Sequence, residues 1–275
     1  MLKVGDESIE VGDQNPRWYR RRDLAKLRTG LARADLLVCD SQATLSACQK
    51  HFPHVKSVCV PLGLNVQTFL PETREKVDML APASEFSKAC HLLIVGSHAP
   101  RKRLKFICQL IGDLDAEVKQ NITVHHVGGD TCPYGGPSAS QLAEQYGVTN
   151  WVSHGGNLSS DSLMQMRHAS EALLFPSASE GFGYPPLEAM ASGTPVLCSD
   201  LPSHNELMPD ETCLQADDKE AWNEAILSVY ANWLSRSKND EHHVWPTPRS
   251  GLMEFASRFD QSRFCLRMAE VYDSL

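Results

Sequence analysis

Short apolar runs alternate along the chain with longer segments in which apolar residues recur every three or four positions. The short runs are typical of buried strands, and the periodic segments are typical of amphipathic helices. The predicted strands are 36–39, 57–60, 91–95, 123–127, 172–175, 195–198 and one beginning at Val152. The predicted helices between them are 41–50, 104–114, 138–146, 160–169 and 186–191. This alternation predicts an α/β fold, a doubly wound Rossmann-like parallel sheet with helices on both faces.

Further helices are predicted near both ends of the chain. In the segment 18–33, Leu24, Leu27 and Leu31 recur at helical spacing among arginines and lysine, which predicts a basic amphipathic helix. A solvated face is the favoured interpretation of its charges, and a contact with a membrane or partner is the alternative. Helices are also predicted at 219–234 and 251–274, whereas 1–16, 71–89 and 238–249 are polar or irregular.

Composition and charge narrow the class of protein. Of 275 residues, 42% are hydrophobic and 22% are charged, which excludes a disordered chain. A net charge of −8 argues against nucleic acid as a partner. No apolar run reaches the about 18 residues that span a bilayer, and we expect a cytoplasmic protein. The nine cysteines have no zinc-site spacing and are interpreted as buried, reduced thiols rather than as redox or metal groups.

One candidate for a binding loop follows the predicted strand 91–95. Gly96 permits a sharp turn, and Arg101, Lys102 and Arg103 then arrive at the start of a predicted helix. The positive end of a helix dipole already favours an anion there, and arginine and lysine both bind phosphates well. These residues fit a diphosphate site, although a solvated cluster of cations explains them equally well.

A second candidate loop follows the predicted strand 172–175. Gly181 and Gly183 allow the backbone to approach a ligand, and two prolines preset the first turn of the next helix. Glu180 lies at the loop entrance, and Glu188 is expected on the first helical turn, where a carboxylate can accept hydrogen bonds from ribose hydroxyls. Each glutamate also fits an ordinary structural role, and composition alone leaves both interpretations open.

Residues 180–196, which read EGFGYPPLEAMASGTPV, resemble the signature of retaining glycosyltransferases of family 4, with two glutamates separated by seven residues. Residues 96–102 resemble the pyrophosphate loop of the same family, but Arg103 stands where the family often has asparagine or glycine. Segments 34–41, 60–64 and 259–272 fit the family as well. The resemblance spans most of residues 34–275.

The resemblance implies a GT-B fold, in which two Rossmann-like domains face each other across a cleft. The expected parts are a truncated remnant of the N-terminal acceptor domain at 1–64, a nucleotide-sugar-binding domain at 65–248, and a C-terminal helix at 249–275 that packs back toward the N-terminal part. Family members have roughly one further domain length before the segment 34–41, most of which we expect to be missing here. The chain would then be the donor-binding half of the fold.

The resemblance further implies a hexosyltransferase that retains anomeric configuration and needs neither a metal nor a resident cofactor. Arg101 and Lys102 would neutralise the leaving diphosphate, and Glu188 would hold the ribose. The implied catalytic residues are Arg101, Lys102 and Glu180, and the implied donor-binding residues are Gly96, Gly181, Phe182, Gly183 and Glu188. Electrostatic stabilisation of the departing diphosphate would supply most of the catalysis.

The implied partners are a nucleotide sugar as donor and a glycan, a lipid-linked molecule or another hydroxyl compound as acceptor. A peripheral membrane contact and a separate protein that supplies the acceptor domain stay open. One alternative function is a non-catalytic nucleotide-sugar-binding subunit without a complete acceptor site. Another is a dinucleotide-dependent oxidoreductase, because Gly181 and Gly183 begin a G-x-G motif, but Pro186 replaces its third glycine. No residue identifies the base, the hexose or the acceptor.

Overall fold

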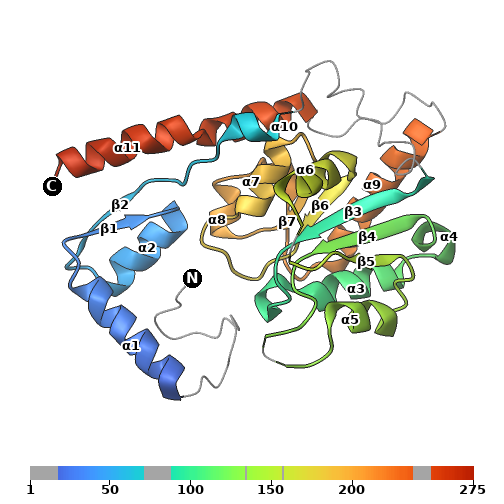
Figure 1. Cartoon of the computed structure of the whole chain (residues 1–275), viewed down its shortest axis with the longest axis horizontal. Coiled ribbons are helices and arrows are strands. Elements are labelled where there is room, and N and C mark those ends of the chain that lie inside the picture. Colours follow the sequence, from blue (N-terminus) through green and yellow to red (C-terminus); the bar gives the residue numbers. More distant parts are fainter. Residues whose placement is uncertain (1–17, 71–87, 134, 157, 238–248) are drawn as a thin grey trace.

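The computed structural model describes residues 18–70, 88–133, 135–156, 158–237 and 249–275 (Figure 1). The expectations for 1–16, for most of 71–89 and for 238–248 lie outside the described residues. A parallel sheet of six strands forms the centre of the molecule. Its strands lie in the order β5 (Trp151–Ser153), β4 (Ile122–Val127), β3 (Cys90–Val95), β6 (Ala172–Phe175), β7 (Val196–Ser199) and β8 (Cys213–Leu214).

The strand order makes this a doubly wound sheet. β3 and β6 are neighbours in its middle, and the chain winds outward from β3 toward β5 and from β6 toward β8. The direction of winding therefore reverses between β3 and β6, which is the position where open α/β sheets bind ligands. The predicted fold class is confirmed. The sequence pattern did not predict β8, because a strand of two residues leaves no recognisable apolar run.

Helices cover both faces of the sheet and enclose two separate hydrophobic clusters (Figure 1). One cluster includes residues of α3 (Leu104–Asp113), α5 (Ala139–Gln145) and α9 (Lys219–Ser237). The other includes residues of α6 (Ser160–Ala169), α7 (Tyr184–Ala191) and α10 (Arg249–Ala256). Leu92 and Leu93 of β3 are both fully buried, one in each cluster. Burial on both faces explains the uninterrupted apolar runs of the central strands.

The C-terminal segment is not the single helix expected over 251–274. α10 is followed by a 3₁₀ turn, η6 (Ser257–Phe259), and by a second helix, α11 (Gln261–Asp273). Asp260 interrupts the helical path because it is the N-cap of α11, where its Oδ1 accepts a hydrogen bond of 2.9 Å from the backbone N–H of Ser262. The same break lets the backbone of Phe259 and Gln261 hydrogen-bond to Leu64.

Residues 18–59, here called the N-terminal unit, form α1 (Trp18–Ala32), β1 (Leu36–Cys39), α2 (Gln42–His51) and β2 (Lys56–Cys59). β1 and β2 pair in parallel beside a small cluster that contains Leu37 and Phe52. The helix expected at 18–33 is confirmed, but Leu24 and Leu27 are exposed, whereas Leu31 packs against the small cluster. Among the described residues, no helix combines the length and apolar composition needed to cross a membrane.

Two hydrogen-bonded contacts attach the N-terminal unit to the loops of the main sheet. The carboxylate of Glu206 accepts hydrogen bonds from the backbone N–H groups of Gln42 and Ala43, at 2.6 and 2.7 Å, at the start of α2. Ser41 is the N-cap of α2, and its Oγ also donates to the carbonyl oxygen of Gly181 at 2.8 Å. The first turn of α2 therefore lies directly against the loop that follows β6.

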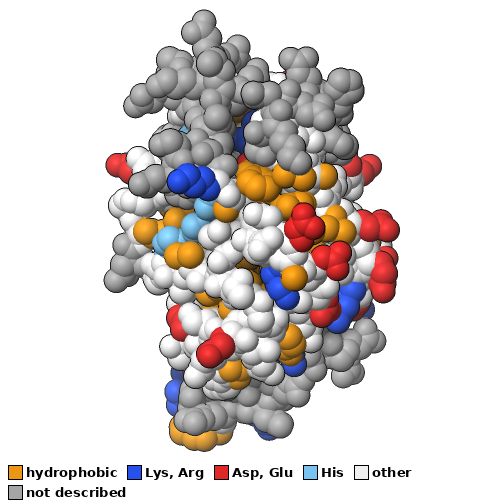
Figure 2. All heavy atoms as spheres, turned by 90° about the vertical axis from the view of Figure 1, so that its right-hand side faces the viewer, with side chains coloured by type: hydrophobic (Ala, Val, Ile, Leu, Met, Phe, Trp, Pro, Cys, Tyr) orange, Lys and Arg blue, Asp and Glu red, His pale blue; other side chains and the backbone are white. Residues whose placement is uncertain are grey.

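Three histidines form a hydrogen-bonded chain across β3, β4 and the residue after β5. His91 Nδ1 lies 2.8 Å from His125 Nε2, and His125 Nδ1 lies 2.9 Å from His154 Nε2. Burial lowers the pKa of His125 to about 4, and the two neighbouring histidines add to this effect. His125 is therefore neutral at neutral pH. Histidine side chains also form a short row among hydrophobic ones on the face seen in Figure 2.

Gly128 lies where the chain leaves β4 and approaches the turn after β3. A Cβ atom at this position would lie 1.9 Å from the carbonyl oxygen of Gly96, so alanine fits only if the turn moves. We expect Gly128→Ala to lower the free energy of unfolding by about 1–3 kcal/mol, measured by urea denaturation. At Gly129 a Cβ atom has no neighbour within 4 Å, and Gly129→Ala is the matched control. If both variants lose the same free energy of unfolding, the close contact between Gly128 and the backbone of Gly96 is contradicted.

Candidate functional site

The two candidate loops meet at the reversal point of the sheet. β3 ends at Val95 and β6 ends at Phe175, and the two strands are adjacent and parallel. The loops 96–103 and 176–183 therefore leave the same edge of the sheet. The backbone N–H of Ala178 donates a hydrogen bond of 2.8 Å to the carbonyl oxygen of Arg101, which joins them. The loops that the sequence singled out thus lie together where open α/β sheets bind ligands.

Arg101, Lys102 and Glu180 form a compact charged cluster at this site. Glu180 Oε1 lies 2.5 Å from Arg101 Nη1 and 2.7 Å from Lys102 Nζ. The side chains of Lys102 and Glu180 are only 10% and 11% exposed, whereas that of Arg101 is 32% exposed. Lys102 Nζ also lies 4.3 Å from the centre of the Phe175 ring, at cation–π distance. The structure thus brings together all three residues for which the resemblance implies a catalytic role.

Burial and charge have opposite effects on the two buried members of the cluster. Burial lowers the pKa of Lys102, and the nearby Glu180 carboxylate opposes this shift. Burial alone would raise the pKa of Glu180, but Lys102 and Arg101 together outweigh it and lower the pKa below its usual value. With the three groups ionised, the cluster carries one net positive charge. Such a cluster can attract an anion that carries more charge than the single carboxylate it already holds.

Gly96 lets the side chain of Lys102 lie close against the backbone. The φ angle of Gly96 is 151°, which side-chain-bearing residues rarely adopt, and a Cβ atom there would lie 3.3 Å from Lys102 Cε. The side chain of Lys102 therefore runs close along the turn after β3. A larger residue at position 96 would push the ammonium group away from Glu180.

The loop 180–183 is held from several directions. Phe182 is 4% exposed and packs edge-on against the rings of Tyr184 and Phe259. Gly183, with φ 119°, is the N-cap residue of α7. A Cβ atom on Gly181 would lie 2.9 Å from Asp40 Oδ2, so glycine lets β1 and this loop approach closely. The backbone around Glu180 is thus positioned by both α7 and the N-terminal unit.

Glu188 was expected on the first turn of its helix, but the structure places it further along. α7 begins at Tyr184 rather than at residue 186, so Glu188 is its fifth residue. Its carboxylate accepts a hydrogen bond from Arg167 of α6, whose side chain is 5% exposed. Burial raises the pKa of Glu188, and Arg167 opposes the shift. Glu188 therefore belongs to an ion pair separate from the Glu180 cluster.

Arg103 does not share an anion site with Arg101 and Lys102, contrary to the sequence interpretation. Its φ of 54° places it in the left-handed region, between the 3₁₀ turn η4 (Pro100–Lys102) and α3. This conformation directs the guanidinium to Asp217 Oδ1 and to the carbonyl oxygen of Ala216, each at 2.5 Å. Arg101 and Lys102 also belong to the 3₁₀ turn rather than to the first turn of the helix.

α8 (Pro202–Asn205) supports this site, which the sequence did not predict. Ser203 Oγ donates a hydrogen bond of 3.0 Å to the carbonyl oxygen of Glu180. His204 is fully buried, and its Nδ1 donates to the carbonyl oxygen of Ser199 at 2.7 Å. Both residues come shortly after the predicted strand 195–198. The carboxyl end of that strand lies at the same edge of the parallel sheet as the two loops, so their position in the sequence could have identified Ser203 and His204 as candidates.

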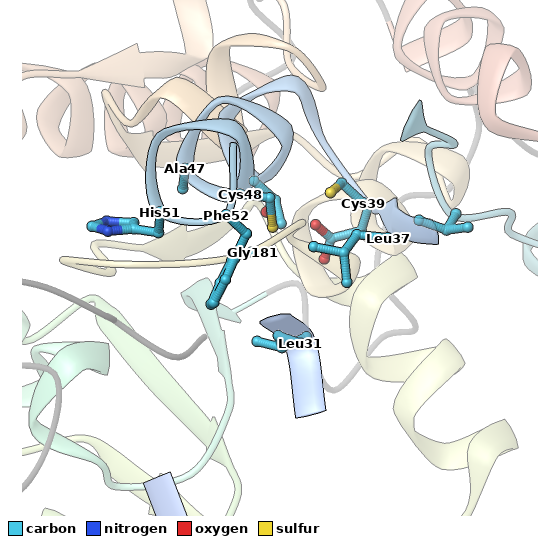
Figure 3. Close-up of a pocket in the computed structure, with 11 residues that line it drawn as sticks. Leu31, Leu37, Cys39, Ala47, Cys48, His51, Phe52 and Gly181 are labelled. Carbon is cyan, nitrogen blue, oxygen red and sulfur yellow. The ribbon is translucent and has the colours of Figure 1, made fainter. Parts of the chain in front are cut away.

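A cavity of about 280 Å³ lies between the N-terminal unit and the loop 180–183 (Figure 3). Its walls are mostly apolar, and Gly181 lies at one side of it. Figure 3 shows Leu31 on one side and Leu37, Cys48 and Phe52 on the other. The cavity offers space for an apolar or mixed group beside Gly181. In the described part of the chain, no group of three or more His, Cys, Asp or Glu side chains could hold a metal ion.

Known proteins resemble this chain in both fold and sequence. The structure of HepE from Anabaena in complex with UDP-glucose superposes with a TM-score of 0.71 over 95% of this chain and 69% of that chain, at 16% identity. O-antigen chain mannosyltransferase RfbU of Salmonella typhimurium is 46% identical over 59 residues, 21% of this chain and 17% of its own length. The MMP alpha-(1->4)-mannosyltransferase of Mycolicibacterium hassiacum is 30% identical over 159 residues, 56% of this chain.

The chain spans only 17% and 34% of the length of these two mannosyltransferases. The structural neighbours are GT-B glycosyltransferases, in agreement with the expected fold class. The family model described as Glycosyl transferases group 1 matches residues 81–242, which include both loops of the candidate site. Because this match covers more than half of the chain, the protein belongs to the group 1 glycosyl transferases, with the GT-B resemblance to family 4 that its motifs indicated.

Proposed function

We propose that this chain binds a nucleoside-diphosphate sugar and transfers its hexose to a hydroxyl acceptor with retention of anomeric configuration and without a metal ion. The observation that carries the proposal is the meeting of Arg101, Lys102 and Glu180 at the reversal point of the sheet. The names of the two relatives, both mannosyltransferases, support it. The UDP-glucose complex of HepE supports a nucleotide sugar as the donor, and we propose mannose as the first hexose to test.

In this proposal the diphosphate replaces Glu180 as the partner of the two cations. Lys102 binds as a compact point charge, and the planar fork of Arg101 binds phosphate oxygens in pairs. The carboxylate of Glu180 then accepts hydrogen bonds from hydroxyls of the donor sugar beside Gly181, Phe182 and Gly183. The two cations stabilise the charge that develops on the leaving group, which is the role a metal ion has in other enzymes.

The transfer step breaks the bond between the anomeric carbon and the diphosphate oxygen and forms a bond from that carbon to the acceptor oxygen. The acceptor hydroxyl loses its proton, which the departing diphosphate can take up. Retention requires the acceptor to approach from the side on which the diphosphate leaves. We propose the cavity beside Gly181 as the approach for the acceptor, which is supported by its position next to the loop 180–183.

Glu188 is proposed to bind the ribose hydroxyls of the donor. Arg167 donates to Oε2 of this carboxylate, and the other oxygen can accept a hydroxyl hydrogen bond. Arg167 is then a positioning residue that fixes the orientation of the acid. The nine free thiols of the chain support a reducing, cytoplasmic location for the reaction.

Binding of a nucleoside diphosphate should stabilise the protein without added metal. At a ligand concentration of a hundred times Kd, the free energy of unfolding should rise by about 2.7 kcal/mol. This corresponds to an increase in Tm of about 5–10 °C for a chain of this size. Differential scanning fluorimetry with UDP, GDP and ADP in the presence of a chelator measures the effect, with the nucleoside monophosphates for comparison. No shift with any diphosphate contradicts the proposed site.

Turnover needs a separate measurement. The full chain is incubated with nucleoside-diphosphate mannose and with nucleoside-diphosphate glucose, together with a panel of hydroxyl acceptors, and the released diphosphate is quantified. Release that depends on the acceptor supports sugar transfer. Donor binding without release across the panel would contradict transfer and support a donor-binding unit instead.

A further inference from the structure

Two cysteines lie side by side on neighbouring strands at one edge of the sheet. Cys198 of β7 and Cys213 of β8 are direct partners in the parallel register, and their sulfur atoms are 3.6 Å apart. Adjacent strands lie about 4.8 Å apart, within the range of Cα separations that a disulfide can bridge. The two thiols are free in the structure. A small rotation of their side chains would bring the sulfurs to bonding distance.

The two thiols differ in pKa and in exposure to solvent. The contact with the Cys198 sulfur lowers the pKa of Cys213, and Cys213 is partly exposed. The same contact raises the pKa of Cys198, which is fully buried. By contrast, burial raises the pKa of Cys39 and of Cys108 to about 12. Cys213 is thus the more accessible of the two sulfurs to an oxidant, with the Cys198 thiol directly beside it.

We propose that Cys198 and Cys213 are a reversible redox pair, which hydrogen peroxide converts into an intramolecular disulfide. The Cys213 thiolate attacks one oxygen of the peroxide and becomes a sulfenic acid, while the other oxygen leaves and takes up a proton to form water. The sulfur of Cys198 then attacks the Cys213 sulfur, and a second water leaves as the disulfide forms. Two thiols and one peroxide yield one disulfide and two waters, and a dithiol reverses the reaction.

The segment between the two cysteines supports the charged cluster. It contains Ser203, which donates to the carbonyl oxygen of Glu180, and Glu206, whose carboxylate holds the start of α2. At its far end, the carbonyl oxygen of Thr212 accepts a hydrogen bond of 3.5 Å from Cys198 Sγ. A disulfide would close this segment into a covalent loop and fix the two-residue edge strand β8 to β7. Oxidation therefore stiffens the support of the Glu180 loop.

Peptide mapping after mild oxidation tests the redox pair. The full chain is treated with a small excess of hydrogen peroxide, its remaining thiols are alkylated, and non-reducing digests are analysed by mass spectrometry. We expect one linked peptide that contains both Cys198 and Cys213 and disappears after dithiothreitol treatment. We also expect the Tm of the oxidised chain to rise by roughly 5–10 °C, as for a loop of this length.

Two variants separate this disulfide from general oxidation of the protein. Cys213→Ser should form no linked peptide and show no rise in Tm, whereas Cys265→Ser, which removes an exposed thiol, should behave like the wild type. Recovery of Cys198 and Cys213 as alkylated thiols when Cys265 is already oxidised would overturn the proposal. An equal rise in Tm in Cys213→Ser would do the same. None of these measurements depends on sugar transfer.

Discussion

Replacement of Lys102 by methionine should reduce kcat/KM for sugar transfer by about 100–1,000-fold, the usual effect of removing one donor that stabilises a developing negative charge. The ammonium group is nearly buried, 2.7 Å from Glu180, so its field at the leaving diphosphate is weakly screened by water. Methionine keeps the length and apolar contacts of the stem, including the approach to Gly96. The variant therefore removes the charge and little else. Steady-state kinetics with the preferred donor measures the effect.

The matched control is Lys105→Met, three residues further along the same segment. Lys105 is exposed on α3, so its loss changes the net charge of the protein by the same amount at a distance from the cluster. We expect its kcat/KM to stay within about twofold of the wild type, because isolated surface charges contribute little. Equal activity of Lys102→Met and Lys105→Met would exclude Lys102 from the donor site. Thermal unfolding of both variants detects any loss caused by misfolding.

Acid should destabilise this protein through His125. Its folded-state pKa of about 4 lies below the usual 6.5, so the unfolded chain binds a proton at a higher pH than the folded one. The contribution of His125 to stability is complete above pH 6.5 and is lost as the pH falls from 6.5 to 4. The shift corresponds to about 3 kcal/mol over this window. A charged His125 would be buried between two other histidines, which explains why the folded state loses stability as the pH falls.

Urea denaturation at several pH values between 7 and 4 measures this contribution. His125→Asn is expected to lower stability at pH 7, because two hydrogen bonds of the histidine chain are lost, but to flatten its dependence on pH. His54→Asn changes an exposed histidine and should leave the pH dependence of the wild type unaltered. If the stability of His125→Asn depends on pH as strongly as that of the wild type, the pH dependence arises from other groups.

The fold could be predicted from the sequence because a parallel sheet covered on both faces leaves a strong signal. Every residue of β6 and β7 is buried, and all of them except Ser199, the last residue of β7, are apolar. Alternation of such runs with helices then allows few topologies. The break at Asp260 was missed because apolar residues continue on both sides of it and hide the local N-cap of α11.

The positions of both loops were predictable, whereas the partners of their side chains were not. Glu180 is 79 residues from Arg101, and only the adjacency of β3 and β6 brings the two together. The left-handed conformation of Arg103 depends on the turn that precedes α3, and residue type alone does not indicate it. The start of α7 at Tyr184 moved Glu188 beyond the first turn, a shift of two residues that periodicity does not resolve.

Glu180 acts as a built-in counterion for the two cations of the site. A ligand with a single negative charge would only exchange one ionic contact for another, while losing its own translational freedom. In the donor complex that we propose, a diphosphate carries enough charge to engage both cations and leaves the carboxylate free for the attached sugar. Because the Glu180 carboxylate already neutralises one of the two cations, we expect affinity to depend less on ionic strength than it does at an open basic surface. We therefore expect this arrangement to discriminate against singly charged anions before any contact with the sugar is made.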